Sequence, residues 1–311
     1  MSDVDLRPGA SRGRADQERG GPSDSGAALA PPGARRACPA CGESRARPCG
    51  LAGPDAGAGS AIVRCPDCSL VFVDPVPVEA TLPESYGPGY YEPWQERREE
   101  RARVRLWQRR LAQIEARQPC GALLDVGCGD GLFLQVARGA GWSVEGIEFS
   151  PEGARRSSRR LGRPVALGDL AEAAGLRGPF DVVTLWHVLE HLTRPAPLLE
   201  AVRHRLRPGG LIVVAVPNLD NLPMRAAYRL ARGRPLPLYE TGAREPHLSH
   251  FAPGSLQSFL RRQGFERIVI RPDRCALTWA KRAVDALAAG LSRVTGRLMT
   301  DAIVAFARRP R

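Results

Sequence analysis

The stretch LLDVGCGDGLFL, Leu123–Leu134, joins an apolar run of strand character to a second one of helical character. Between them lie three glycines in the pattern G-x-G-x-G, tighter than the G-x-G-x-x-G of dinucleotide-binding loops. Glycines at such a turn let backbone N–H groups and the helix N-terminus approach a ligand closely. Asp125 ends the strand, and a carboxylate there would repel a pyrophosphate but suit a positively charged ligand. The pattern therefore predicts a ligand-binding loop at Gly127, Gly129 and Gly131.

The segments after residue 120 alternate between short apolar strands and helices. Strands that are apolar throughout, each followed by about one helix of sequence, are typical of a parallel sheet covered on both faces. We therefore predict an α/β fold with a Rossmann-like sheet, in which ligands bind at the carboxyl ends of the strands. The segments are ALLDVG, LFLQVARGAGW, SVEGIEF, PEGARRSSRRLG, PVALGDL, FDVVTLWHV, PAPLLEAVRHRLRPGG and LIVVAVPN.

Acidic residues follow the first three of these strands. Glu148 lies about 20 residues after the glycine loop, the separation at which an acid can receive ribose hydroxyls. Asp169 ends the third strand, where it could meet an adenine amino group. Any one of these acids, Asp125 included, could be an ordinary solvated residue at a strand end. Together with the glycines, they predict a site for a nucleoside-containing ligand.

Four cysteines form two C-x2-C pairs, in CPACG and CPDCS. Four thiolates on two tight turns make the closed tetrahedral set that a structural zinc ion prefers. Two disulfides or four unrelated cysteines are the alternatives, and a cytoplasmic location disfavours the disulfides. Cys49, Cys120, Cys128 and Cys275 are expected to be ordinary packing or surface residues. The predicted zinc ligands are Cys38, Cys41, Cys65 and Cys68.

Composition and charge limit the remaining classes. The formal net charge is +12, but Lys281 is the only lysine and the arginines are scattered, so the charge is weak support for a nucleic-acid or membrane partner. The longest apolar run is far shorter than the roughly 18 residues of a membrane span, and the N-terminus lacks the apolar core of a signal peptide. We expect a soluble, cytoplasmic protein.

The chain divides into four predicted parts. The first is rich in Gly, Pro, Ser and charge and cannot repay its ordering entropy. Before Pro119, apolar residues recur at intervals of three and four, which predicts a helix. The parts are a disordered arm at 1–34, a zinc-ribbon-like segment at 35–80, a linker and helix at 81–119, and the main domain at 120–311 with inserts at about 219–250 and 272–300.

These motifs resemble those of class I S-adenosylmethionine-dependent methyltransferases, in the group that includes the ubiquinone-biosynthesis O-methyltransferases. The resemblance covers roughly residues 120–271 and rests on LLDVGCGDGLFL, VEGIEFS, ALGDL, FDVVTLWHVLEHL and LRPGGLIVVAVPN. A ribbon like CPACG…RCPDCSLVFVDPVP also precedes the domain in that group. The resemblance implies an antiparallel last strand, which FERIVIR and DAIVAFARR would complete.

The resemblance also implies a cofactor site for S-adenosylmethionine. Asp125, Gly127 and Gly129 would face the methionine part. Glu148 would bind the ribose. The remaining expected members are Asp169 with Leu170 at the adenine, Gly131, Phe149, and Cys128 as a packing residue.

Transfer to a hydroxyl needs a base, and five histidines are available. His187, Glu190 and His191 follow the fourth strand at spacings of three and four, which would put them on one helical face at the catalytic edge. We expect His187 and His191 to be catalytic. His247 and His250 are weaker candidates, and His250 could simply cap or pack the next helix. Glu190 and the histidines could hold a metal, but no ligand spacing requires one, so we expect no catalytic metal.

An apolar stripe marks residues 278–300, where Ala280, Val284, Leu287, Leu291, Val294 and Leu298 recur at fours and threes. Packing on the domain's own surface is the first interpretation of this stripe. A dimer seam and a peripheral membrane helix are the alternatives.

Taken together, the motifs predict methyl transfer to a small hydroxyl, amine or carbon acceptor, for example a sugar or secondary metabolite. An RNA base methyltransferase that grips RNA with the ribbon, and a non-catalytic scaffold, stay open as alternatives.

Overall fold

The computed structural model describes residues 36–49, 59–77, 97–173, 175–240, 246–275 and 279–311. All of them belong to one unit, Pro32–Arg311. The predicted arm at 1–34 and most of the predicted linker before residue 97 lie outside the described residues.

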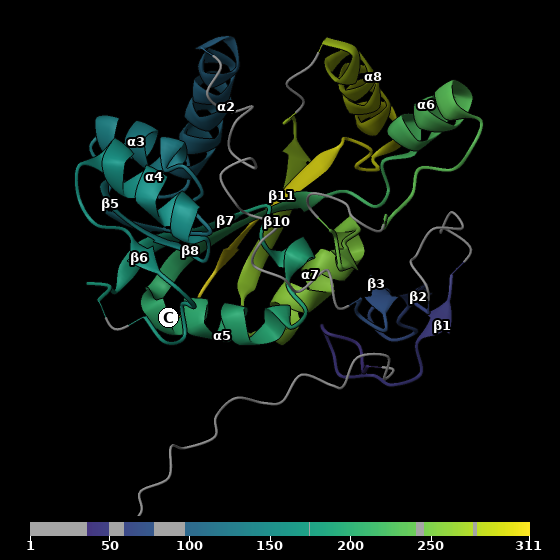
Figure 1. Cartoon of the computed structure of the whole chain (residues 1–311), viewed down its shortest axis with the longest axis horizontal. Coiled ribbons are helices and arrows are strands. Elements are labelled where there is room, and N and C mark those ends of the chain that lie inside the picture. The colour runs from purple at the N-terminus through teal and green to yellow at the C-terminus, as the bar shows by residue number, and fades with distance from the viewer. Residues whose placement is uncertain (1–35, 50–58, 78–96, 174, 241–245, 276–278) are drawn as a thin grey trace, which may run out of the picture. The chain divides into compact units, whose positions relative to one another are not determined.

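The main sheet has seven strands in the order β10-β11-β8-β7-β4-β5-β6 (Figure 1). Strands β8, β7, β4, β5 and β6 are parallel to one another, whereas β11 runs antiparallel between β8 and β10. The predicted sheet with its antiparallel last strand is thus confirmed. The strands are β4 (Ala122–Val126), β5 (Ser143–Glu148), β6 (Ala166–Leu167), β7 (Phe180–Trp186), β8 (Leu206–Pro217), β10 (Glu266–Asp273) and β11 (Ala302–Arg308).

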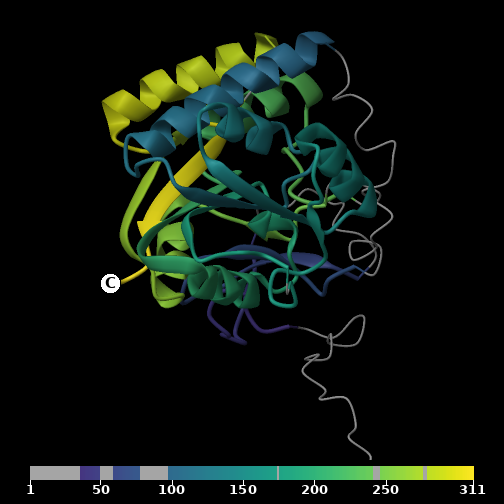
Figure 2. The same ribbon diagram turned by 90° about the vertical axis from the view of Figure 1, so that its left-hand side faces the viewer.

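Both faces of the central strands of this sheet are buried, which explains why these strands are mainly apolar. On β8, Val213 and Ala215 join one hydrophobic cluster while Ile212 and Val214 join the other, because successive side chains point to opposite faces. Figures 1 and 2 show α2, α3 and α4 on one side of the sheet and α5 and α7 on the other. The bounds are α2 (Arg97–Glu115), α3 (Leu132–Gly139), α4 (Pro151–Leu161), α5 (Pro195–Arg205) and α7 (Pro253–Arg262).

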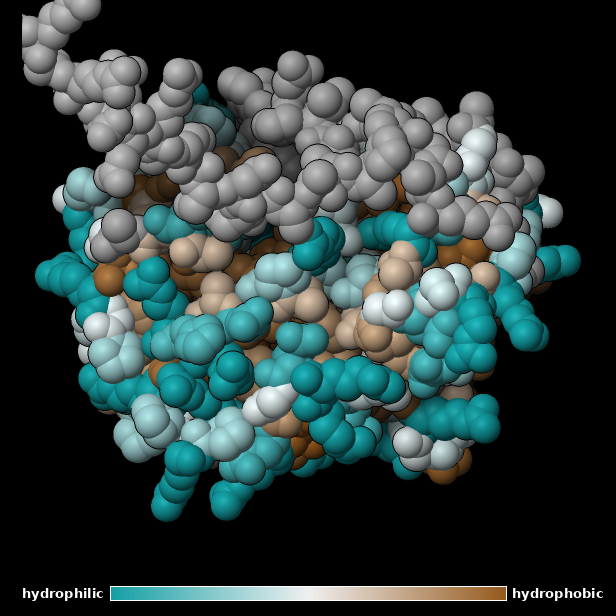
Figure 3. All heavy atoms as spheres, turned by 90° about the horizontal axis from the view of Figure 1, so that it is seen from below, coloured by the Kyte–Doolittle hydropathy of each residue, from teal (hydrophilic) through white to brown (hydrophobic). Residues whose placement is uncertain are grey.

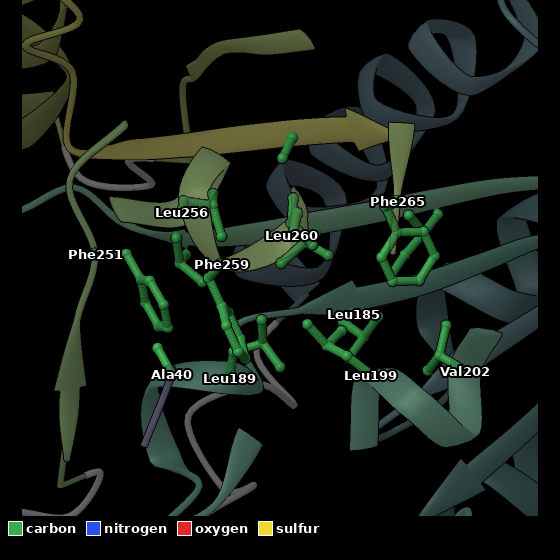
Figure 4. Close-up of a cluster of buried hydrophobic side chains, with 14 of the residues drawn as sticks. Ala40, Leu185, Leu189, Leu199, Val202, Phe251, Leu256, Phe259, Leu260 and Phe265 are labelled. Carbon is green, nitrogen blue, oxygen red and sulfur yellow. The ribbon is translucent and has the colours of Figure 1, made fainter. Parts of the chain in front are cut away.

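A second, four-stranded antiparallel sheet contains the ribbon. Three of its strands come from the ribbon, but the fourth, β9, belongs to the main domain. The ribbon also shares the main core, where Ala40 lies near Leu189 and Phe259 (Figure 4). The strands are β1 (Arg47–Pro48), β2 (Ala61–Arg64), β3 (Val71–Asp74) and β9 (Ser249–His250).

Helix α8 (Trp279–Thr295) corrects one prediction, because the predicted stripe is not the face that packs. Its buried residues are small or polar, Asp285, Ala288, Ala289 and Ser292, and α8 packs against α6 (Leu222–Arg232). Of the predicted stripe, Leu287, Leu291 and Val294 are exposed. The sequence pattern identifies an apolar stripe, but which face finds a neighbour depends on α6.

The surface opposite α8 is mixed in character. Viewed from the α5 side, hydrophilic side chains surround a central area in which apolar ones also show (Figure 3). Among the described residues, no helix combines the length and apolar character that crossing a bilayer requires.

Candidate functional site

The glycine loop connects β4 to α3 at the carboxyl edge of the sheet. Gly127, Gly129 and Gly131 have φ angles of 70°, 56° and 75°, in the left-handed region that favours glycine. A Cβ at Gly127 would lie 2.8 Å from Val188 Cγ2, and one at Gly131 would lie 2.5 Å from Ser157 Oγ. The loop therefore needs glycine both for its backbone conformation and for its space, as the sequence pattern predicts.

Glu148, at the end of β5, is bonded to the glycine loop. Its Oε2 accepts a hydrogen bond from the Gly129 backbone N–H at 2.7 Å, and its Oε1 accepts one from the Ser150 N–H at 2.9 Å. Burial raises the pKa of this carboxyl, and the two backbone donors oppose the shift. Each oxygen still has a lone pair, because a carboxylate accepts about four hydrogen bonds. Glu148 can thus hold the loop and also accept from two neighbouring hydroxyls.

Asp125 is a buried carboxyl in the strand that leads into the loop. Its side chain is 2% exposed, and Oδ1 accepts a hydrogen bond of 2.6 Å from Thr184 Oγ1. Burial raises the pKa of Asp125 to about 8, with the nearby Glu148 adding to the shift and Thr184 opposing it. A cation placed nearby would favour the ionised form and lower this pKa again.

Apolar side chains are exposed at the ends of β5 and β6. Phe149 directly follows Glu148 and is 60% exposed, and Leu167, the β6 partner of Glu148, is 57% exposed. Asp169 is exposed and accepts a hydrogen bond from its neighbour Ala171 N–H at 2.8 Å. Leu170 is buried in the core. This edge offers apolar surface beside a carboxylate, a setting suited to a flat aromatic base.

Side chains from α2 and α4 support the loop. Arg103 forms a bidentate ion pair with Asp130, at 2.7 and 2.9 Å, and both side chains are buried. Arg160 Nε donates to the Asp130 carbonyl at 3.0 Å. Cys128 is buried, with Sγ 3.4 Å from Ser157 Oγ. The helix before the main domain is thus joined to the glycine loop.

The cluster after β7 does not form the single helical face that the spacing predicted. His187 has φ of 57°, a left-handed conformation that histidine adopts more readily than most residues, and only a short 3-10 helix, η4 (Leu189–His191), follows it. The side chains nevertheless converge on Glu190, whose Oε1 lies 3.3 Å from His187 Nδ1 and 4.0 Å from His191 Nε2. Glu190 is 1% exposed, and neither of its carboxylate oxygens accepts a hydrogen bond of normal geometry.

His187 also contacts a buried ion pair between Arg110 and Asp273. Arg110 Nη2 lies 3.1 Å from His187 Nε2. A guanidinium only donates, so this contact favours a proton on Nδ1, facing Glu190. Burial lowers the pKa of His187, but Cys275 and Glu190 raise it more, to about 10, while Arg110 opposes them. The contact with Arg110 requires an unprotonated Nε2, whereas a pKa of this height would protonate Nε2 as well; in both cases Nδ1 carries a proton at neutral pH and faces Glu190.

The second pair of histidines lies beside the first cluster. His191 Nδ1 is 3.0 Å from the Pro246 carbonyl, and the rings of His191 and His247 are 4.9 Å apart. His250 lies in β9, and burial lowers its pKa to about 3. Its suggested capping role is wrong, because Ala252 is the N-cap of α7, but it is buried and packed.

The four predicted zinc ligands converge. Their sulfur atoms all lie within 4.8 Å of one another, and the pairs Cys38–Cys68 and Cys41–Cys65 are 3.5 Å apart. All eight cysteines of the chain are free thiols. Zinc–sulfur bonds of about 2.3 Å in a tetrahedron would put the sulfurs about 3.8 Å apart, so the donor set fits zinc.

The charged side chains that α2 contributes to the site were not predicted. Arg103 and Arg110 counted only among the scattered arginines, yet both are buried. They alternate with Trp107 and Ile114 at intervals of four, three and four, which puts all of them on the packed face. This spacing could have indicated from the sequence that the two arginines are buried. For Cys275 and Asp273 no such signal exists, because only β10 brings them to His187.

Comparison with known proteins gives matches for the sequence and for the fold. The sequence model of a family described as "Methyltransferase domain" matches residues 94–269. The ubiquinone biosynthesis O-methyltransferase of Thiobacillus denitrificans is 32% identical over 117 residues, 35% of this chain and 50% of that protein. The enzyme of the same description from Xanthomonas axonopodis pv. citri is 37% identical over 132 residues, 39% of this chain and 53% of that protein. The chain spans about half the length of these curated relatives.

Among solved structures, an S-adenosylmethionine-dependent methyltransferase from Thermotoga maritima has a TM-score of 0.51 and 16% identity. The match covers 73% of this chain and 98% of that one. At this identity the likeness concerns the fold alone.

Proposed function

Because the chain belongs to the methyltransferase domain family, we propose that it transfers a methyl group from S-adenosylmethionine to a small-molecule acceptor. The observation that carries the proposal is the bond between the loop and Glu148, in which the Gly129 N–H donates to a carboxylate that keeps room for a ribose diol. No specific feature of the described residues favours an RNA substrate or a purely structural role.

The residues around the loop fit the parts of S-adenosylmethionine. Gly127, Gly129 and Gly131 leave space for close approach to the backbone, and Asp125 would be ionised by a cationic ligand. We propose that Glu148 accepts from the ribose hydroxyls and that Phe149 offers its exposed ring to the adenine. When bound, the cofactor supplies an electrophilic methyl group on a positively charged sulfur.

On the acceptor side we propose His187, with His191 as the second candidate. Arg110 and Glu190 fix the His187 ring from its two nitrogens, so its orientation is set before a substrate arrives. Alignment of this kind can contribute up to about 7–11 kcal/mol to a bimolecular reaction. An acceptor oxygen would form the new bond as the carbon–sulfur bond breaks, with the electron pair staying on sulfur and the hydroxyl proton passing to the histidine that acts as the base. The names of the curated relatives support an oxygen acceptor over an amine or carbon.

We also propose that Cys38, Cys41, Cys65 and Cys68 hold one structural zinc ion. Four protein sulfurs leave no open coordination position, so the ion would stabilise the ribbon without taking part in methyl transfer. The ribbon is small and buries its apolar side chains in clusters that it shares with the main domain, which supports a need for a metal to hold its own turns.

The exposed face of α8 supports a peripheral contact with a membrane surface. Trp279, Leu287 and Val294 are 84%, 61% and 87% exposed, and Arg282 and Arg293 are exposed on the same helix. Apolar side chains with cationic neighbours are typical of helices that lie in the lipid interface. The contact would bring the enzyme to acceptors held in a membrane.

Calorimetric titration with S-adenosylhomocysteine tests the main proposal. We expect saturable binding of one molecule per chain to the zinc-loaded protein, followed by transfer of a labelled methyl group to an acceptor from a panel of hydroxyl compounds. Absence of binding to a folded, zinc-loaded protein would refute the methyltransferase function.

A further inference from the structure

We propose that Arg110 and Asp273 are positioning residues for methyl transfer that act through His187, holding its ring in place and releasing Nε2 when an acceptor hydroxyl arrives. Arg110 Nη2 lies 3.1 Å from His187 Nε2. The same guanidinium pairs with the Asp273 carboxylate, where Nε donates to Oδ1 at 3.3 Å and Nη2 contacts Oδ2. The inference rests on the proposed function, because it concerns the histidine that we place on the acceptor side.

The burial of this ion pair supports a role beyond stability. The side chains of Arg110 and Asp273 are each 3% exposed. Taking two charges out of water is costly, and their attraction often only balances that cost, so apolar residues of similar volume would often serve a core equally well. The pair lies instead where β7 ends and His187 follows. What it adds at this place is an N–H group directed at the imidazole ring.

Two tryptophans restrict the guanidinium further. Arg110 Cζ lies 4.8 Å from the ring centroid of Trp107 and 4.6 Å from that of Trp186. The two indole rings are themselves 5.6 Å apart, so they form a corner in which the guanidinium sits. Trp186 is the residue before His187, and Trp107 lies one turn before Arg110 on α2. Lysine lacks both the planar group that packs in this corner and the forked donors that reach two partners.

The backbone of His187 also indicates that the position of its ring is enforced. Its φ of 57° is a left-handed conformation, which in a non-glycine residue persists only where the surrounding structure determines it. The His187 N–H donates to the Ala215 carbonyl of β8 at 2.9 Å, and Glu190 Oε1 lies 3.3 Å from Nδ1. Strand β8, η4 and α2 therefore each hold this residue, and β10 holds it through Arg110. Support from this many segments is typical of a side chain whose direction matters for chemistry.

Arg110 and an acceptor hydroxyl use the same lone pair of His187. With its proton on Nδ1, the ring has one acceptor atom, Nε2, and Arg110 occupies it. The His187 side chain remains 31% exposed, so a hydroxyl can approach the ring. Arg110 can then release Nε2 without becoming an unpaired buried cation, because Asp273 keeps it paired. The hydroxyl proton passes to Nε2 as the carbon–oxygen bond forms and the carbon–sulfur bond breaks, with the electron pair staying on sulfur.

A double-mutant cycle tests whether the pair acts through His187. Arg110→Met with Asp273→Asn removes the pair without leaving a buried charge unpaired, and His187→Asn removes the ring with a residue that tolerates the left-handed conformation. In the full-length, zinc-loaded protein, the pair variant should lower kcat at least about tenfold and bind S-adenosylhomocysteine within about twofold of the wild type. It should cause no further loss in protein that already carries His187→Asn. An equal further loss there would overturn the inference. Arg110→Lys, which keeps the charge beside Asp273, is a second variant and should also lower kcat.

A second measurement needs no acceptor. In protein with nitrogen-15-labelled histidine, correlation spectra of the five rings report which nitrogens carry protons, and His187→Asn identifies the signals of His187. The pair variant should shift the Nε2 signal of His187. Arg207→Gln is the matched control, because Arg207 pairs with Asp181 at 2.6 Å at the other end of β7 and should leave that signal unchanged.

The two measurements separate this inference from the proposed function. An unchanged His187 signal in a pair variant that still binds S-adenosylhomocysteine would overturn the inference alone. Absence of S-adenosylhomocysteine binding to the wild type would refute the proposed function, and the inference with it.

Discussion

The substitution Glu148→Gln tests the cofactor site most directly, because it keeps the size of the side chain and removes its charge. In the wild type, Oε2 and Oε1 each accept one backbone N–H, from Gly129 and Ser150, and the proposed ribose hydroxyls would share the same oxygens. The amide keeps only one acceptor. A hydrogen bond to a charged group contributes about 1.5–3 kcal/mol, so losing one should raise the dissociation constant roughly 10- to 100-fold.

The same change leaves one backbone N–H facing an amide donor. An unsatisfied buried donor costs about 1–3 kcal/mol, so the melting temperature should also fall by several degrees. Binding of S-adenosylhomocysteine should therefore be measured by calorimetry well below the unfolding transition. Glu145→Gln is the matched control: it lies on the same strand and accepts the Arg177 N–H at 2.9 Å, away from the loop. A folded Glu148→Gln protein with affinity within twofold of the wild type would refute the ribose assignment.

Four further predictions follow from the same contacts. Asp125, with its pKa near 8, should release a proton when a cationic cofactor binds, so affinity for S-adenosylmethionine should rise with pH up to about 8; calorimetry in buffers of different ionisation enthalpy measures the release, which Asp125→Asn should abolish. His187→Ala should bind cofactor normally but turn over at least roughly 100-fold more slowly, and unchanged turnover would exclude a catalytic role. Cys65→Ser should remove zinc, measured by elemental analysis, and lower the melting temperature, whereas full zinc content would contradict the ribbon assignment. Trp279→Ser with Val294→Ser removes apolar contact and should weaken sedimentation with anionic and with neutral vesicles alike; equal binding of wild type and variant would remove α8 from the contact.

The parts of the fold that could be predicted are those with a local signal. The glycine loop requires positive φ angles at Gly127 and Gly131, and only glycine adopts them without strain, so the letters alone reveal the turn. The parallel strands can be recognised because burial on both faces makes most of their residues apolar. The zinc ligands are visible because each pair sits within one tight turn. Each of these features depends on neighbours a few residues away.

The features that could not be predicted depend on contacts between distant segments. In the sequence, Arg110 cannot be distinguished from the many other arginines. Its burial depends on an ion pair with Asp273, which comes from a strand far along the chain. His187 was expected on a helix, but a left-handed residue ends β7 and turns the side chain toward Glu190. Helix α8 has a clear apolar stripe, yet a stripe cannot say which face α6 will cover. In these three cases the spacing of residues in the sequence allows more than one structure, and contacts between distant segments determine which one forms.

These long-range contacts indicate a structural role for the ribbon, which supports β9 and the neighbouring His247. Strand β9 has two residues, too few to be stable alone, and it is held by its ladder to β3 and by the bond from Leu248 to Glu190. The glycine loop depends on none of these, because β4, β5 and Arg103 of α2 hold it. Loss of the ribbon would therefore disturb the position of His247 against Glu190 while sparing the loop. Different parts of the fold therefore hold the cofactor loop and the histidines of the acceptor side. A change to the ribbon can alter the position of these histidines and lower turnover while cofactor binding stays the same.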